Sequence, residues 1–388
     1  MEKSWMDKGK LQMEFEKYID RRQSDSLKWQ RYAGRDVLPL WVADMDFAIP
    51  EPVTRALQQR LQHDIFGYGV LSQGTKQAVC QWLLRRWQVE VTPSQLVTLP
   101  AVVPGLNFAV ESQQLSDIGF FSPVYPPIRK VADNLNIRGR AFELKMEAGQ
   151  YRMPLEQIEQ AAAGGMQGLL LCNPHNPGGT IWTDAELQQL LALSRQYELL
   201  LISDEIHGDL ILPGHRHRSL SALAQEQDRV ITLMSAGKSF NLAGLPMAFA
   251  IVKPGGLRQS LKGWLQGRCA THNVLAAVAM ETAFSQCQPW LDALTEYLGQ
   301  NWRLLEQTLS SVAGVTLMAP QATYLAWIDC RGLGWETPSK VFTDYGVGLS
   351  CGTEFGAPGF VRLNFACPRE TLELALSRML KAIETHQP

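Results

Sequence analysis

The chain has 388 residues, of which 46% are hydrophobic, and its 36 basic and 38 acidic side chains give a formal net charge of -2. That length is sufficient for one large α/β domain with an appended unit, or for two or three smaller domains. The nearly balanced charge provides no field that would gather phosphate backbones or anionic lipid, so nucleic acid and membrane surfaces are poor candidates for the main partner. We therefore expect a protein that acts on small molecules.

The N-terminal stretch MEKSWMDKGKLQMEFEKYIDRRQ is charged and lacks the apolar core of a signal peptide, and no run approaches 18 uninterrupted apolar residues. A cytoplasmic protein is the simplest interpretation. The seven cysteines stand singly, without a Cys-x-x-Cys pair, so we expect reduced thiols that mostly fill the core and no structural metal site. They are Cys80, Cys172, Cys269, Cys287, Cys330, Cys351 and Cys367.

Short apolar runs alternate with helical patterns between about residues 95 and 252. Such near-continuous runs are typical of strands buried on both faces. The predicted strands cover residues 97–100, 118–123, 168–174, 199–205, 230–238 and 247–252. Between two of them, Thr183 and Glu186 form a capping box that starts a helix. Strands separated by helices predict an α/β fold with a mostly parallel sheet and right-handed crossovers.

The pattern changes after about residue 275. Apolar residues recur at spacings of three and four between residues 291 and 309, which predicts one long amphipathic helix. We expect this helix to lead into a smaller α+β unit that ends in the helix ETLELALSRMLKAIE. The predicted organisation is an N-terminal arm (residues 1–50) that packs with the small unit, a large domain (51–285) and a small C-terminal domain (286–388).

Three polar clusters interrupt the buried strands where each strand gives way to a loop. In an open α/β sheet, the carboxyl ends of the strands converge on one crevice, so these clusters should meet there. The first cluster is NPHNPGG, whose prolines and glycines fix an irregular backbone from which Asn176 can present its amide. An ordinary strand-to-helix turn is the alternative for this motif.

The other two clusters place a charge at the end of a buried strand. Asp204 in SDEIHGD is costly there without a partner. It is either a helix cap, half of an ion pair with an arginine, or the counter-ion of a protonated ring nitrogen. Lys238 in SAGKSFNLAG is a snorkelling side chain or a buried amine whose pKa is lowered for imine chemistry. With Asn176, and with the Ser235 hydroxyl for an anion, these residues describe a pyridoxal phosphate site.

The order NPHNPGG, SDEIHGD, SAGKSFNLAGL and FVRLNFACPRE resembles that of the fold-type I pyridoxal phosphate enzymes, the aspartate aminotransferase superfamily. The motifs PLWVADMDFAIPEPV, FGYG and SPVYPPI look like those of the cystathionine β-lyase branch, which includes MalY, PatB and cystalysin. The resemblance implies the α/β fold of the fold-type I PLP-dependent transferases. It also implies pyridoxal 5′-phosphate as the cofactor and a homodimer with shared active sites.

The resemblance assigns the residues around the cofactor ring. It implies that Lys238 binds the cofactor aldehyde and acts as the catalytic base, and that Asp204 pairs with the pyridine nitrogen. Asn176 should bind the ring hydroxyl and a substrate group, with His207 beside it. Tyr125 should stack on the ring face.

The resemblance also assigns the phosphate end of the cofactor. It implies that Ser235 and the backbone amides of Val102 and Val103 hold the phosphate. Tyr68 should reach the phosphate of the neighbouring subunit.

For the substrate, the resemblance implies that Arg362 clamps the carboxylate, helped by the backbone near Ala43. The chain departs from many relatives at the phosphate end. Pro246 stands where many aminotransferases have an arginine, Gly237 where a hydroxyl residue is common, and Ala101 where a glycine often begins the phosphate loop. The phosphate would then depend on backbone amides and a helix dipole, which predicts weaker retention of the cofactor.

We hypothesise a carbon-sulfur β-lyase that converts L-cystathionine or related cysteine S-conjugates to a thiol, pyruvate and ammonia, with Tyr68 or Lys238 protonating the departing sulfur. An aminotransferase on the same scaffold is the main alternative, and a cofactor-binding regulatory protein is the third. No second basic residue for a distal carboxylate is evident, which predicts tolerance of varied S-substituents.

Two further groups have ordinary structural interpretations. His215 and His217 lack a third metal ligand at a useful spacing and are predicted to lie in a solvated loop. Trp41 and Asp44 either line the substrate entrance or pack in the core or against the arm.

Overall fold

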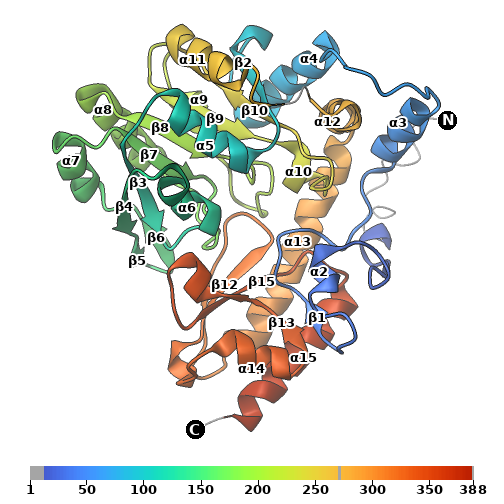
Figure 1. The fold of residues 1–388 in the computed structure, drawn as a ribbon. Helices are drawn as coiled ribbons and strands as arrows, with labels where there is room; N and C mark the ends of the chain where they lie inside the picture. The colour runs from blue at the N-terminus through green and yellow to red at the C-terminus, as the bar shows by residue number, and fades with distance from the viewer. Residues whose placement is uncertain (1–12, 270–271, 387–388) are drawn as a thin grey trace.

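A seven-stranded sheet forms the centre of the larger half of the molecule (Figure 1). The computed structural model describes residues 13–269 and 272–386. The strand order is β2-β10-β9-β8-β7-β3-β4, and only β10 runs antiparallel to its neighbours. The strands are β2 (Leu96–Leu99), β3 (Asp117–Ser122), β4 (Arg138–Glu143), β7 (Gly168–Cys172), β8 (Leu200–Asp204), β9 (Val230–Met234) and β10 (Ala248–Ile251). The mostly parallel sheet is thus confirmed.

Two details of the sheet differ from the sequence prediction. The strand predicted over residues 230–238 ends at Met234, because Ser235 caps a short helix, α10 (Ala236–Ser239), which carries Lys238. Strand β4 was not predicted. It lies at the edge of the sheet with only Phe142 buried, so it lacks the apolar run that marks the interior strands.

Helices cover both faces of this sheet and connect its strands. The capping box predicted at Thr183 and Glu186 is confirmed: Thr183 Oγ1 accepts from the Glu186 amide at 3.2 Å, and the Glu186 carboxylate accepts from the Thr183 amide at 2.9 Å. The helices are α3 (Glu51–Leu61), α4 (Gln73–Trp82), α5 (Val102–Ser112), α6 (Pro126–Leu135), α7 (Leu155–Ala163), α8 (Asp184–Tyr197), α9 (Leu220–Leu223), α11 (Gly255–Leu265) and α12 (Val274–Gln286), with a π-helical turn η2 (Leu83–Trp87), a 3₁₀ turn η3 (Pro93–Gln95) and a hairpin of β5 (Lys145–Glu147) and β6 (Gln150–Arg152).

The smaller half is built on the long helix α13 (Gln288–Leu309), which confirms the helix predicted from the apolar spacing. A four-stranded antiparallel sheet of order β11-β12-β15-β14 follows it. Its elements are β11 (Thr316–Met318), β12 (Leu325–Asp329), β14 (Ser350–Cys351), β15 (Phe360–Asn364), η4 (Arg331–Leu333), η5 (Gly352–Phe355), α14 (Pro338–Asp344) and α15 (Arg369–Thr385).

The N-terminal segment packs with this smaller half. Strand β1 (Leu38–Pro39) pairs in parallel with β13 (Val347–Gly348), and the buried Phe15 ring contacts Phe47, Trp290 and Tyr297 at centroid distances of 5.2 to 5.5 Å. The predicted arm begins at residue 1, and its first twelve residues lie outside the described part of the chain. The domain boundaries at residues 50 and 285 remain our proposal.

A buried group of charges fastens that segment, which also contains the short helix α2 (Leu27–Gln30). Lys28 has no exposed side-chain surface, and its Nζ lies 2.7 Å from Asp46 and 3.6 Å from Asp44. Arg21 binds the same two carboxylates, at 2.8 and 2.9 Å. Each buried charge is therefore compensated, as burial requires.

One loop prediction is half wrong. His215 is exposed, as expected, but His217 is only 5% exposed. Its Nε2 lies 3.0 Å from Glu205 Oε2, and its ring meets Trp87 edge-on at 5.1 Å. The buried Glu205 carboxylate at the end of β8 needs a partner, and the loop supplies one.

Within residues 13–269 and 272–386, no helix is long and apolar enough to cross a membrane. All seven cysteines are free thiols, as predicted.

Candidate active site

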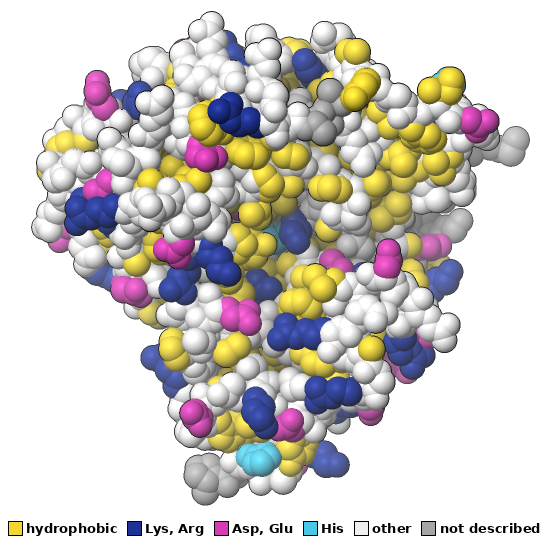
Figure 2. All heavy atoms as spheres, in the orientation of Figure 1, with side chains coloured by type: hydrophobic (Ala, Val, Ile, Leu, Met, Phe, Trp, Pro, Cys, Tyr) yellow, Lys and Arg dark blue, Asp and Glu magenta, His cyan; other side chains and the backbone are white. Residues whose placement is uncertain are grey.

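A cavity of about 410 Å³ lies between the carboxyl ends of the parallel strands and the smaller half of the molecule. Figure 2 shows it as a hollow with basic side chains at its base and charges of both signs around it. Every predicted site residue except Tyr68 lines it. These residues are Ala43, Val102, Val103, Tyr125, Asn176, Asp204, His207, Ser235, Lys238 and Arg362.

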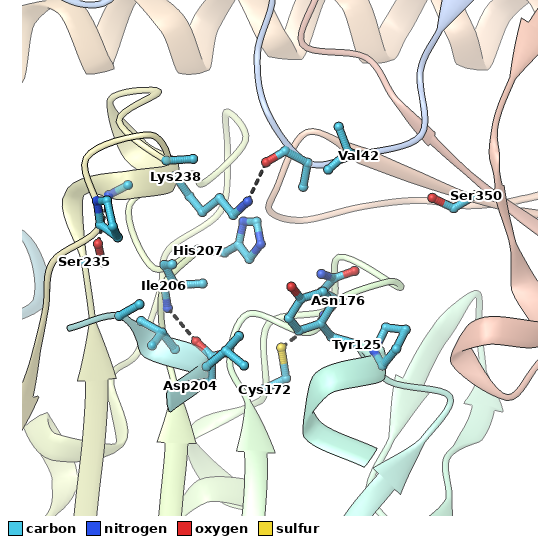
Figure 3. Close-up of a pocket in the computed structure, with 18 of the residues that line it drawn as sticks. Val42, Tyr125, Cys172, Asn176, Asp204, Ile206, His207, Ser235, Lys238 and Ser350 are labelled. Atoms are coloured by element: carbon cyan, nitrogen blue, oxygen red, sulfur yellow. Dashed lines mark hydrogen bonds between the residues drawn. The ribbon is translucent and has the colours of Figure 1, made fainter. Parts of the chain in front are cut away.

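Lys238 points into this cavity from α10 (Figure 3). Its Nζ donates a short hydrogen bond to the backbone oxygen of Ala43. Burial, reinforced by the positive charge of Arg362, lowers the pKa of Lys238 to about 8. A lysine with such a pKa has a usable fraction of neutral amine near neutral pH, which the formation of an imine requires.

Asp204 ends β8 beneath the cavity, and only 3% of its surface is exposed. Its Oδ1 accepts one hydrogen bond, from the Ile206 amide at 3.1 Å, and within the described residues it forms no ion pair. Burial raises the pKa of Asp204 to about 7. The interpretation as an arginine partner is therefore wrong. An underpaired carboxylate fits a cationic ring nitrogen, which would restore its charged form.

Arg362 reaches the cavity from β15 and is 4% exposed. Its Nη1 donates to Asn176 Oδ1 and its Nη2 to the Trp41 oxygen, each at 2.9 Å, and its guanidinium lies 4.7 Å from the centre of the Phe355 ring. Its buried Nε has no hydrogen-bond partner among the described residues. A buried guanidinium with an unpaired N–H that faces a cavity suits a carboxylate ligand.

His207 and Cys172 complete the inner wall of the cavity. Burial, with the nearby positive charge of Lys238, holds the pKa of His207 well below its usual range, so the imidazole is neutral. Its Nδ1 is buried without a partner in the described part of the chain. The Cys172 sulfur accepts a hydrogen bond from the backbone N–H of Asn176 at 3.4 Å. From the sequence this thiol is expected to fill the core, because a cysteine in an apolar strand gives no signal of its place at a site.

The end of the cavity at which the sequence predicts phosphate binding is formed by the start of α5. Ala101 is its N-cap and provides no side-chain hydrogen bond, so the first N–H groups of the helix, at Val102 and Val103, face the cavity end without a capping side chain. Such an end of an eleven-residue helix is a good site for a phosphate. The Ser235 hydroxyl, which is predicted to donate to the phosphate, already has another acceptor. Its hydroxyl donates to the Met247 oxygen at 2.6 Å and would have to rotate to bind an anion.

Tyr68 lies outside the cavity of its own chain, with its side chain 99% exposed. Its predicted role in a neighbouring subunit stays a prediction.

Residues 41–43 form a strap of backbone carbonyls across the cavity, a unit that the sequence does not predict. The Trp41 oxygen accepts from Arg362, and the Ala43 oxygen accepts from Lys238 and from the Tyr324 hydroxyl, the latter at 3.0 Å. Trp41 therefore lines the cavity, whereas Asp44 does not and is paired with the arm. Since these contacts join segments far apart in sequence, no local motif signals them.

The model of the family described as aminotransferase class I and II matches residues 35–379. The chain belongs to this family. It is 35% identical over 387 residues to a protein named cystathionine beta-lyase PatB, from Bacillus subtilis, and the match covers 96% of this chain and 100% of that protein. The predicted resemblance to this branch is therefore confirmed.

Two solved structures extend the comparison. A crystal structure of OvoB matches with a TM-score of 0.92 and 41% identity, covering 95% of this chain and 98% of that one. The PLP-bound C-S lyase from Staphylococcus hominis matches with a TM-score of 0.87 and 30% identity, covering 95% and 97%. The predicted fold-type I architecture is confirmed. The family, together with a cavity whose lysine, aspartate and helix end fit the group, identifies pyridoxal 5′-phosphate as the cofactor.

Proposed function

We propose that the protein is a PLP-dependent carbon-sulfur β-lyase that acts on L-cystathionine or related cysteine S-conjugates. One observation carries the chemistry: the amine of Lys238, with its pKa lowered to about 8, faces the same cavity as the buried guanidinium of Arg362. This pairing suits removal of the Cα proton from an amino acid whose carboxylate is held in place. The relatives named cystathionine beta-lyase and C-S lyase support elimination as the outcome.

Each polar residue has a defined task in this proposal. Arg362 binds the α-carboxylate and turns the Cα–H bond toward Lys238, which takes the proton. General base catalysis of this kind contributes about 10²- to 10⁴-fold in rate. Asp204 keeps the ring nitrogen protonated, Tyr125 stacks on the ring, and Asn176 and His207 orient the ring hydroxyl. The cofactor, when bound, supplies the electron sink for the carbanion.

The second proton completes the elimination. Lys238, or Tyr68 from a second subunit, gives a proton to the departing sulfur as the Cβ–S bond breaks. The remaining three-carbon unit is released and hydrolysed to pyruvate and ammonia.

We also propose a homodimer in which Tyr68 completes the partner's site. Tyr68 belongs to an exposed apolar segment, in which Ile65, Phe66 and Val70 are 69%, 49% and 93% exposed. Segments of this kind mark protein interfaces. Mixing Tyr68→Phe subunits with Lys238→Ala subunits tests the arrangement, because a hybrid dimer regains one intact site. If mixing restores no activity, the shared site is wrong.

The product spectrum separates the lyase from the aminotransferase. We expect purified enzyme saturated with cofactor to release pyruvate stoichiometrically from L-cystathionine without any keto acid, and the Lys238→Ala variant to lose turnover and the visible absorption of the cofactor-lysine adduct. Consumption of the amino acid only in the presence of a keto acid would instead indicate an aminotransferase. Absence of the adduct absorption in the wild-type protein would favour the regulatory alternative.

A further inference from the structure

Glu354 lines the cavity, and the guanidinium of Arg129 lies next to its backbone; neither side chain belongs to the machinery described above. Glu354 lies in η5 and lines the cavity, next to the Phe355 ring on which Arg362 rests. Arg129 lies on α6, one turn after Tyr125, and its Nη1 is 3.4 Å from the backbone oxygen of Glu354. The Arg129 guanidinium, from the larger half of the molecule, thus lies beside the backbone of Glu354, from the smaller half.

The Arg129 guanidinium and the Glu354 carboxylate do not form an ion pair with each other. The Arg129 guanidinium contacts the Glu354 backbone carbonyl, and within residues 13–269 and 272–386 neither side chain takes part in an ion pair. Arg129 is half-buried and Glu354 is exposed, so both remain accessible. Besides Glu354, the charges that line the cavity are those of Asp204, Lys238 and Arg362, which already have tasks.

A glycine makes the position of Arg129 possible. Gly356 has a φ of +96°, and a Cβ built on it would lie 2.9 Å from Arg129 Nη1 and 2.9 Å from Ser122 Oγ. Any side chain there would crowd the guanidinium, in a backbone conformation that L residues rarely adopt. The local backbone thus keeps room for the Arg129 guanidinium beside η5.

A neighbouring cation and anion that do not pair with each other can together bind a zwitterion, each through the group of opposite charge. A guanidinium binds a carboxylate through two parallel hydrogen bonds, and a carboxylate binds an ammonium group. We propose that Arg129 and Glu354 bind a second α-amino-acid group at the distal end of the substrate, while Arg362 holds the reacting end. This inference rests on the proposed function and narrows its substrate class to thioethers with an amino-acid group at both ends, such as L-cystathionine.

This assignment revises the expectation drawn from the sequence. Arg129 is a second basic residue for a distal carboxylate, on a helix whose sequence PPIRKVADNL shows no sign of that role. The enzyme then prefers one class of S-substituent and does not accept all classes equally.

A matched series of L-cysteine S-conjugates tests the proposal on the cofactor-saturated enzyme. L-Cystathionine carries both distal groups, S-(3-carboxypropyl)-L-cysteine only the carboxylate, S-(3-aminopropyl)-L-cysteine only the ammonium, and S-propyl-L-cysteine neither. Pyruvate release gives kcat/KM for each. We expect each charged contact to raise kcat/KM about 5- to 30-fold over S-propyl-L-cysteine, the range of partly exposed charge-assisted hydrogen bonds.

Variants assign each contact to its residue. Arg129→Met lowers the ratio of kcat/KM for the carboxypropyl conjugate to that for the propyl conjugate, and Glu354→Gln lowers the corresponding ratio for the aminopropyl conjugate. The control is Lys130→Met, which removes the same charge from an exposed neighbouring position on α6 and leaves both ratios unchanged. Calorimetry of L-cystathionine binding to cofactor-loaded Lys238→Ala protein, with and without Arg129→Met, measures the contact without turnover.

The failures are distinguishable. Equal ratios in Arg129→Met, Glu354→Gln and wild type, with pyruvate formed from the whole series, overturn this assignment and leave the lyase standing. Absence of pyruvate from all four conjugates overturns the proposed function. In that case calorimetry still tests whether Arg129 binds the distal group. An affinity for L-cystathionine that Arg129→Met leaves unchanged overturns the assignment of Arg129.

Discussion

Arg362 Nη1 donates a 2.9 Å hydrogen bond to the side-chain oxygen of Asn176. The bond joins β15 of the smaller half to the loop after β7 of the larger half, directly across the cavity. The proposed carboxylate clamp and the proposed partner of the ring hydroxyl are therefore one hydrogen-bonded unit, and a change at Arg362 should affect both.

We expect Arg362→Lys to lower kcat/KM for L-cystathionine about 10²- to 10³-fold. An ammonium group on one stem cannot hold Asn176, the Trp41 carbonyl and a carboxylate in the planar arrangement of a guanidinium, and damage to a buried charge-assisted contact is costly. Steady-state kinetics measures the loss. Arg331→Lys is the control, because Arg331 is a 65% exposed arginine paired with Asp329 at 2.6 Å and should leave kcat/KM unchanged. A decrease in kcat/KM of less than about tenfold would show that Arg362 does not hold the substrate carboxylate.

Asp204 should make the stability of the cofactor-free protein depend on pH. Burial raises its pKa from 3.8 to about 7, so the folded form binds the proton more tightly than the unfolded form. The stabilisation is complete below about pH 4 and is lost as the pH rises through about 7. Over that interval, we expect the free energy of unfolding of the wild type to fall relative to Asp204→Asn by on the order of 4 kcal/mol. Urea unfolding at several pH values measures it.

The bound cofactor provides the control for this prediction. With pyridoxal 5′-phosphate in place, Asp204 gains a cationic partner and the fall should disappear. A cofactor-free protein whose stability relative to Asp204→Asn stays flat between pH 4 and 7 would contradict the raised pKa.

Lys28→Met should destabilise the protein by about 3 to 5 kcal/mol, because it leaves the buried carboxylate of Asp46 without one of its two cationic partners. The free energy of unfolding in urea is the measurement. Lys340→Met is the matched control. Lys340 is likewise paired with an aspartate, Asp344, at 2.9 Å, but its side chain is 74% exposed. Its substitution should therefore lower the free energy of unfolding by less than about 1 kcal/mol. Equal effects of the two substitutions would show that the arm charges contribute no more than a surface pair.

Pro246→Arg should tighten binding of pyridoxal 5′-phosphate about tenfold, the value of one added charge-assisted hydrogen bond to the phosphate. Pro246 lines the cavity at the end formed by α5, where the chain otherwise offers backbone amides. Titration of cofactor-free protein gives the dissociation constant. Pro246→Ala separates the effect of the new charge from the loss of the proline, and an affinity equal in both variants would refute the explanation.

The buried strands and the polar residues at their ends could be predicted from the sequence. Strands β7 and β8 are continuous apolar runs, and a charged residue such as Asp204 directly after such a run is too costly to be incidental. Helix α13 was predictable for a related reason, since its apolar spacing repeats over 22 residues. Edge strand β4 and the burial of His217 lacked these signals.

By itself, the sequence determined the mostly parallel sheet, because burial imposes its pattern residue by residue along the chain. Its motifs also indicated the cofactor class and marked Lys238, Asp204 and Arg362 as candidate site residues. Only the tertiary structure decided how these groups are paired. The carbonyl of Ala43 meets Lys238 across 195 residues of sequence, and Arg129 meets Glu354 across 225. Such contacts depend on how two independently patterned halves pack, and no local spacing encodes that arrangement.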